Sequence, residues 1–90
     1  MSAFMDNKAL QRFELSAGEG VIFAAYRRDG AICLIDHVET PPALRGRGLA
    51  GRLMEAIMAA ARAEGFKVRP VCGYAVAHLR RHPEHRDLIA

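Results

Sequence analysis

Apolar and polar residues alternate along the first half of the chain, and this pattern predicts three strands. Residues 10–15 alternate imperfectly, residues 21–26 are rich in β-branched and aromatic side chains, and residues 31–38 form a longer apolar run. The Asp29-Gly30 pair between the last two segments is a strong signal for a hairpin turn. We therefore expect a three-stranded antiparallel meander.

The second half of the chain changes to helical spacing. From Leu49 onward, apolar residues recur every three or four positions, which predicts a helix of about 16 residues that ends at Gly65. Residues 66–72 alternate again and predict a fourth strand, which a right-handed crossover places parallel to the third. Residues 74–81 predict a short C-terminal helix, ended by Pro83. The predicted fold class is α+β, a meander plus a β–α–β unit with one parallel strand pair.

Composition and charge narrow the class of protein. The length suits one domain over residues 1–90, with an irregular start over residues 1–8. A net charge of +3, without a basic face studded with aromatic residues, favours an anionic small ligand over nucleic acid. No apolar run approaches the ~18 residues of a membrane span, and no apolar leader is present. We therefore expect a cytoplasmic protein that does not enter a membrane.

The two cysteines carry no metal or disulfide pattern. Cys33 and Cys72 are far apart in the sequence, which fits neither a disulfide framework nor a zinc motif. The expectation is two reduced thiols and no metal site.

A glycine-rich turn immediately before the predicted long helix is the main candidate for a ligand site. Residues 45–48 read Arg-Gly-Arg-Gly, so backbone N–H groups, the positive end of a helix dipole and two guanidinium groups come together. Gly46, Gly48 and Gly51 also satisfy the dinucleotide fingerprint, but the preceding antiparallel strands do not fit a Rossmann unit. No Gly-Lys-Ser/Thr follows, which excludes a P-loop. The turn therefore predicts a phosphate site of another kind.

Residues 45–50 resemble the Gln/Arg-x-x-Gly-x-Gly/Ala signature of the GNAT superfamily of N-acetyltransferases. Residues 37–42, 67–72 and 81–84 resemble its small, single-domain YjdJ-like branch, so the resemblance covers roughly residues 12–88. It implies a minimal GNAT-like fold in which the turn binds the pyrophosphate of acetyl-CoA and the pantetheine arm lies between two diverging strands. The residues that it implies for coenzyme A binding are Val38, Glu39, Arg45, Gly46, Arg47, Gly48, Leu49 and Ala50.

Acetyl transfer to an amine needs a neutral nucleophile, a stabilised oxyanion and a proton for the departing thiolate. His37 is the candidate base, because a histidine changes protonation near neutral pH; the alternative is a polar residue that closes a strand. Cys72 can accept the acetyl group or protonate the leaving sulfur, or it can pack as a small buried side chain. Tyr74 resembles in position the tyrosine that many of these enzymes use as a general acid. Direct and covalent transfer both stay open.

The resulting hypothesis is an N-acetyltransferase that moves an acetyl group from acetyl-CoA to an amine acceptor, either a small molecule or a protein. One alternative is a coenzyme A-binding module with little turnover, since the chain lacks the N-terminal helices that shape acceptor sites in larger relatives. A small basic nucleic-acid-binding protein is the less favoured alternative. Both a monomer and a homodimer fit the sequence, and no motif identifies the acceptor.

Overall fold

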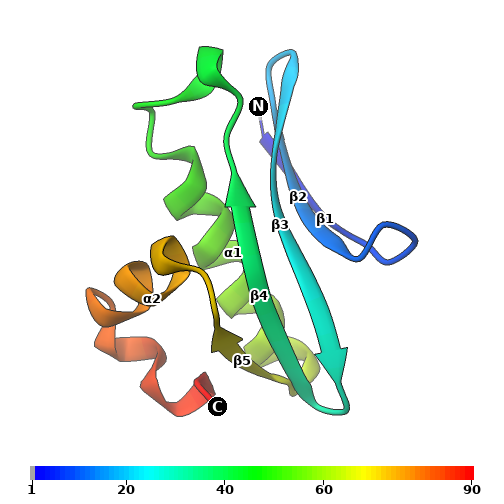
Figure 1. Ribbon diagram of the computed structural model, residues 1–90, viewed down its shortest axis with the longest axis vertical. Coiled ribbons are helices and arrows are strands. Elements are labelled where there is room, and N and C mark those ends of the chain that lie inside the picture. The colour runs from blue at the N-terminus through cyan, green and yellow to red at the C-terminus, as the bar shows by residue number, and fades with distance from the viewer. Residues whose placement is uncertain (1) are drawn as a thin grey trace.

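The computed structural model describes residues 2–90, and these residues form a five-stranded sheet packed against helices (Figure 1). The first four strands are antiparallel neighbours in chain order, and the fifth pairs parallel with the fourth. The predicted meander and the predicted parallel pair are both confirmed. The strands are β1 (Ser2–Asn7), β2 (Arg12–Ala17), β3 (Gly20–Asp29), β4 (Ile32–Glu39) and β5 (Lys67–Pro70).

Helix α1 (Leu49–Glu64) begins directly after the glycine-rich turn and ends at Gly65, as its spacing predicted. Helix α2 (Gly73–Arg80) follows β5 and packs against α1, β4 and β5. Short 3-10 turns, η1 (Pro42–Leu44) and η2 (Pro83–Leu88), precede α1 and follow α2. Within residues 2–90, neither helix has the length and apolar character needed to cross a membrane.

One face of the sheet forms the core together with α1. Alternate residues of β2, β3 and β4 are buried, whereas the residues between them are partly or fully exposed. Helix α1 contributes its apolar stripe to the same cluster, which explains why its polar residues lie on the other side. The largest fully buried side chains are Phe13, Ile22, Ile35, Leu53, Met54, Ile57, Met58 and Val68.

The N-terminal segment is an edge strand, so the expectation of an irregular start is wrong for Ser2–Asn7; Met1 lies outside the described residues. Phe4 stacks on Phe13 with ring centroids 5.8 Å apart. The Tyr26 hydroxyl donates a hydrogen bond of 2.6 Å to the Asp6 carboxylate. The sequence signal for β1 was weak because the charged residue Asp6 occupies one of the few positions of this strand that contact the core. Strand β1 is therefore stabilised by contacts with β2 and β3, and its own sequence shows no clear alternation.

Strands β4 and β5 separate beyond Ile35. The N–H groups of Val71 and Cys72 both donate to the Ile35 carbonyl, and the chain then leaves the sheet. Strand β4 continues to Glu39 beside β3, and within residues 2–90 no strand pairs with its other edge over residues 36–39. A bulge at Asp36 shifts the register with β3, which bends the strand at this point. The divergence expected from the resemblance is present.

Candidate functional site

Two adjoining hollows lie between the end of β4 and the start of α1, and we call them together the β4–α1 groove. They share four lining residues, so they form one continuous depression. The first hollow, of about 390 Å³, is lined by His37, Val38, Glu39, Thr40, Arg45, Ala50 and Tyr74. The second, of about 210 Å³, is lined by Thr40, Leu44, Arg45, Gly46, Gly48, Leu49, Ala50 and Tyr74.

The floor of the second hollow is the glycine-rich turn. Gly46 and Gly48 have φ angles of 80° and 71°, in the left-handed region that residues with a side chain rarely adopt. Gly48 is also the N-cap of α1, so no side chain caps the helix, and the first turn contains no acidic residue. The first intrahelical bond runs from the Arg52 N–H to the Gly48 carbonyl. The N–H groups before it therefore have no acceptor within the helix.

The two arginines of the turn are placed differently. Arg45 Nε donates to the Thr40 carbonyl at 3.1 Å, which ties the turn to the end of β4. Its two terminal amino groups take no part in that bond. Arg47 is exposed and does not line either hollow. Both side chains leave the turn electropositive, because no carboxylate from residues 2–90 pairs with either of them.

His37 lies at the end of β4 and opens into the first hollow. Its Nε2 is hydrogen-bonded to the Glu39 carboxylate, which is on the same side of the strand. The Phe23 ring meets the imidazole edge-on, with centroids 6.3 Å apart. The His37 side chain is 58% exposed, so this imidazole is accessible to a ligand and to solvent.

Tyr74, at the start of α2, forms the other wall of the groove, and Cys72 precedes it in the chain. Cys72 Sγ accepts a hydrogen bond of 3.4 Å from the Ala75 N–H and thereby caps the helix. The Cys72 side chain is half-buried against the core and does not line either hollow. Tyr74 lines both hollows. A Cβ on Gly51 would lie 3.8 Å from the Tyr74 hydroxyl, which places that hydroxyl beside the first turn of α1.

The structure thus brings together most of the residues expected from the sequence to bind a ligand. His37, Val38, Glu39 and the turn residues except Arg47 share one groove, whereas Arg47 and Cys72 lie outside its lining. Thr40 was missed, although it lines both hollows and accepts a hydrogen bond from Arg45. Its only sequence signal was its place between the strand and the proline pair.

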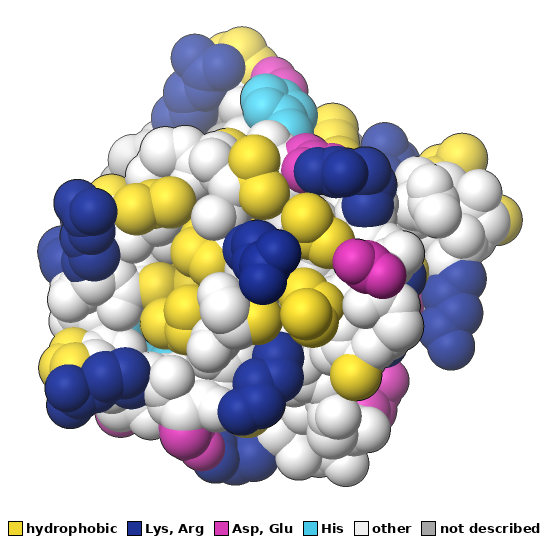
Figure 2. Space-filling view, turned by 60° about the horizontal axis from the view of Figure 1, so that its bottom comes forward, with side chains coloured by type: hydrophobic (Ala, Val, Ile, Leu, Met, Phe, Trp, Pro, Cys, Tyr) yellow, Lys and Arg dark blue, Asp and Glu magenta, His cyan; other side chains and the backbone are white. Residues whose placement is uncertain are grey.

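The basic residues near the C-terminus do not form one patch. His82 and His85 turn inward, toward α2 and α1 respectively. Arg80 and Arg86 instead border a separate apolar hollow of about 360 Å³ between β5, α2 and η2. Figure 2, which turns that end of the molecule forward, shows apolar side chains with Lys and Arg side chains among and around them.

Comparison with known proteins identifies the family. A family model described as GCN5-related N-acetyl-transferase matches residues 12–88. The chain belongs to this family. The GNAT resemblance inferred from the turn is therefore confirmed, whereas membership of the YjdJ-like branch stays a prediction.

A solved structure shows the same GNAT fold. The solution structure of a GCN5-like candidate N-acetyltransferase from Staphylococcus aureus aligns with a TM-score of 0.75. The alignment covers 98% of this chain and 87% of that chain, at 22% sequence identity. At that identity the likeness establishes the fold alone. No curated protein matches the chain.

Proposed function

We propose that this GNAT protein binds acetyl-CoA in the β4–α1 groove and transfers the acetyl group to an amine. The observation that carries the proposal is the start of α1. An uncapped helix N-terminus, two glycines in the left-handed region and an electropositive rim meet there. Such a site matches a pyrophosphate, whose oxygens accept several N–H groups at once.

The charges around the turn support an anionic ligand. An acidic side chain in the first turn usually stabilises a helix N-terminus, and α1 has none. Arg45 is held in place through Thr40 and can direct its remaining donors at a phosphate. Arg47, at the exposed rim, supplies a second positive charge. We assign the pyrophosphate contacts to these arginines and to the backbone of Gly46, Gly48, Leu49 and Ala50.

The unpaired edge of β4 suits the pantetheine arm. Residues 36–39 keep one edge of backbone N–H and C=O groups without a strand partner among the described residues. The arm contains amides that can pair with such an edge as an added strand does. Val38 and Glu39 lie there, and the first hollow continues toward His37. The thioester would then lie near the end of β4.

His37 is the base that we assign to the amine. Its hydrogen bond to Glu39 orients the imidazole, and its exposure admits an acceptor from solvent. The amine nitrogen bonds to the thioester carbon, the C–S bond breaks, and His37 takes the surplus proton from nitrogen. The thiolate takes a proton from Tyr74, which lines the groove. Cys72 as a covalent acetyl carrier is the alternative route, because it precedes Tyr74 by two residues at the start of α2, although its side chain does not line the groove.

Calorimetric titration with acetyl-CoA tests the binding step. The wild type should bind at sub-millimolar ligand, and Gly48→Glu should weaken binding at least about tenfold, because it puts a carboxylate where the phosphates bind. Gly18→Glu is the matched control: Gly18 also has a positive φ and open space, but it lies in the β2–β3 hairpin. Absence of binding by the wild type, or equal binding by Gly48→Glu and the wild type, contradicts the proposal.

Thiol release from acetyl-CoA in the presence of amines tests the transfer step. Direct transfer predicts that turnover survives Cys72→Ser and falls in His37→Ala. A covalent route predicts an acetyl adduct on the wild-type protein without acceptor, lost in Cys72→Ser. Binding without turnover by any amine tested would favour the coenzyme A-binding module instead.

A further inference from the structure

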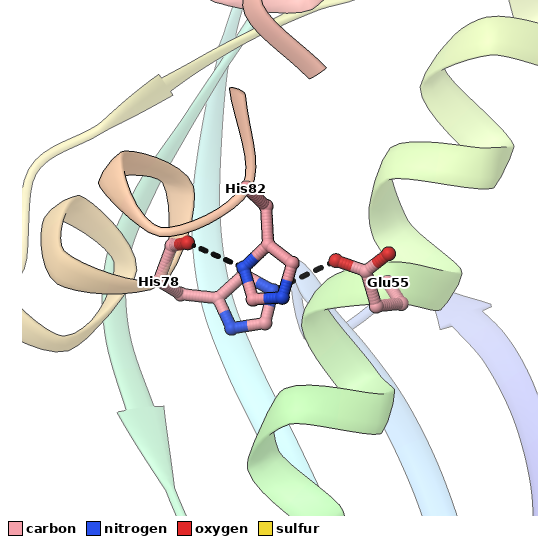
Figure 3. Close-up of side chains that lie close together, drawn as sticks. All are labelled: Glu55, His78 and His82. Carbon is pink, nitrogen blue, oxygen red and sulfur yellow. Dashed lines mark hydrogen bonds and ion pairs between the residues drawn. The ribbon is translucent and has the colours of Figure 1, made fainter. Parts of the chain in front are cut away.

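Three histidines and a glutamate meet on the side of α2 that faces α1. His78 is on α2, and His82 and His85 follow it along the chain. Glu55 approaches from the middle of α1, and Figure 3 shows it facing the rings of His78 and His82. Neither the turn nor the groove residues belong to this cluster.

The distances within the cluster are short. His78 Nε2 lies 2.8 Å from one Glu55 oxygen, and His85 Nε2 lies 3.0 Å from each Glu55 oxygen. One ligand atom from each of Glu55, His78 and His82 lies within 4.8 Å of the other two. His78 is only 3% exposed, so the cluster is partly shielded from water.

The hydrogen bond of His82 determines which of its nitrogens is free. His82 Nδ1 lies 2.7 Å from the His78 carbonyl oxygen. Because a carbonyl oxygen can only accept, Nδ1 carries the hydrogen. The neutral ring then presents the lone pair of Nε2, and a backbone carbonyl that fixes the other nitrogen is the usual partner of a metal-bound histidine.

We propose that Glu55, His78 and His82 bind a zinc ion, with His85 as a positioning residue. The ligand atoms are one Glu55 carboxylate oxygen and the Nε2 atoms of both histidines. The His85 Nε2–H donates to the Glu55 carboxylate and lies 3.0 Å from each of its oxygens. A water molecule completes the tetrahedral coordination that zinc prefers.

Zinc binding requires a small rearrangement of the cluster. His82 lies beyond the end of α2, and its ring stacks on the His78 ring with centroids 4.1 Å apart. The two rings must tilt apart to bind one ion, because an imidazole nitrogen presents its lone pair in the plane of the ring. Around a tetrahedral zinc with bonds near 2.1 Å, ligand atoms lie about 3.4 Å apart. The 2.8 Å between Glu55 and His78 must therefore widen by about 0.6 Å, and the ion replaces the proton between them.

The ion would join two parts of the fold that are distant in sequence. Glu55 belongs to α1, whereas both histidines belong to the segment after β5. Helix α2 also carries Tyr74, so zinc would fix the helix that forms one wall of the groove. The zinc site does not depend on acetyl-CoA binding, and it can be tested without that ligand.

Zinc titration of the untagged, chelator-treated chain tests the proposal. We expect one zinc per chain by native mass spectrometry and a calorimetric dissociation constant of about 1 μM or lower. His82→Ala should weaken binding by at least about tenfold, because it removes one of three protein ligands. His37→Ala is the matched control: it removes a histidine that also pairs with a glutamate, outside the cluster, and should leave zinc affinity unchanged.

A second variant guards against a folding defect in His82→Ala. Glu55→Gln keeps the size and the hydrogen-bonding capacity of the side chain but removes the anionic ligand, so it too should weaken zinc binding. Circular dichroism checks that each variant is folded, and one zinc equivalent should raise the melting temperature of the wild type but not of Glu55→Gln. The proposal is overturned if the wild type binds no zinc below about 100 μM, or if both variants bind as tightly as the wild type.

Discussion

Replacing Gly48 with alanine tests the geometry on which the proposed phosphate site depends. Gly48 has a φ of 71°, and a Cβ placed there meets no atom within 4 Å. The added methyl group therefore has space, and only the backbone conformation opposes it. An L-residue in the left-handed region costs roughly 1–2 kcal/mol, and the reduced entropy of the unfolded chain returns about 0.4–1 kcal/mol. We expect a net loss of about 1 kcal/mol in the free energy of unfolding.

Urea unfolding followed by circular dichroism measures this loss, and thermal unfolding should show a decrease of roughly 4–8 °C in the melting temperature. Gly73→Ala is the matched control. Gly73 also has open space for an added methyl group, but it opens α2 without a positive φ. It should be neutral or slightly stabilising. The reasoning is refuted if Gly48→Ala is as stable as the wild type, since the turn would then not need the left-handed conformation.

Three further predictions concern the core and its buried titratable groups. Leu53→Ala should lower the free energy of unfolding by about 2–5 kcal/mol, because Leu53 is fully buried beneath the sheet; a loss below about 1 kcal/mol in urea unfolding would contradict this packing. A thiol reagent should modify Cys72 in the folded protein but reach buried Cys33 only in denaturant, and rapid native reaction of both thiols would be incompatible with the fold. Burial raises the pKa of Cys33 from 9.0 to about 12 and, helped by Asp6, also raises the pKa of Tyr26. The contribution of these two groups to the free energy of unfolding should therefore be constant below about pH 9 and decrease above it, because the unfolded chain releases protons that the folded chain retains. Tyr26→Phe should make this decrease shallower above about pH 10. An unchanged pH profile in Tyr26→Phe would count against the role of the hydroxyl.

Strong local patterns predicted β2, β3, β4 and α1 correctly. The alternation in β2, β3 and β4 and the helical spacing from Leu49 to Gly65 are repeated several times, so chance deviations matter little. Strand β5 is shorter than expected because residues 71 and 72 turn toward Ile35 and leave the sheet. Strand β1 was missed because its stability comes from contacts with Phe13 and Tyr26, which are distant in sequence.

The candidate site likewise contains some residues that the sequence predicted and some that it did not. The Arg-Gly-Arg-Gly turn was recognisable because adjacent residues form it, and the positive φ angles at its glycines agree with that interpretation. The positions of Thr40 and Tyr74 in the groove were not predictable from local pattern, since they depend on how β4 ends and where α2 packs.

By itself, the sequence determined the order of β2 to β5 and of the two helices, the glycine-rich turn before α1 and the family resemblance, because each of these depends on neighbouring or periodically spaced residues. Only the tertiary structure decided which distant side chains meet. Glu55 is 23 residues from His78 and 30 from His85, and nothing in their spacing indicates that one carboxylate contacts both rings. The packing of α2 and η2 against α1 brings them together, since it places the end of the chain beside the middle of the long helix.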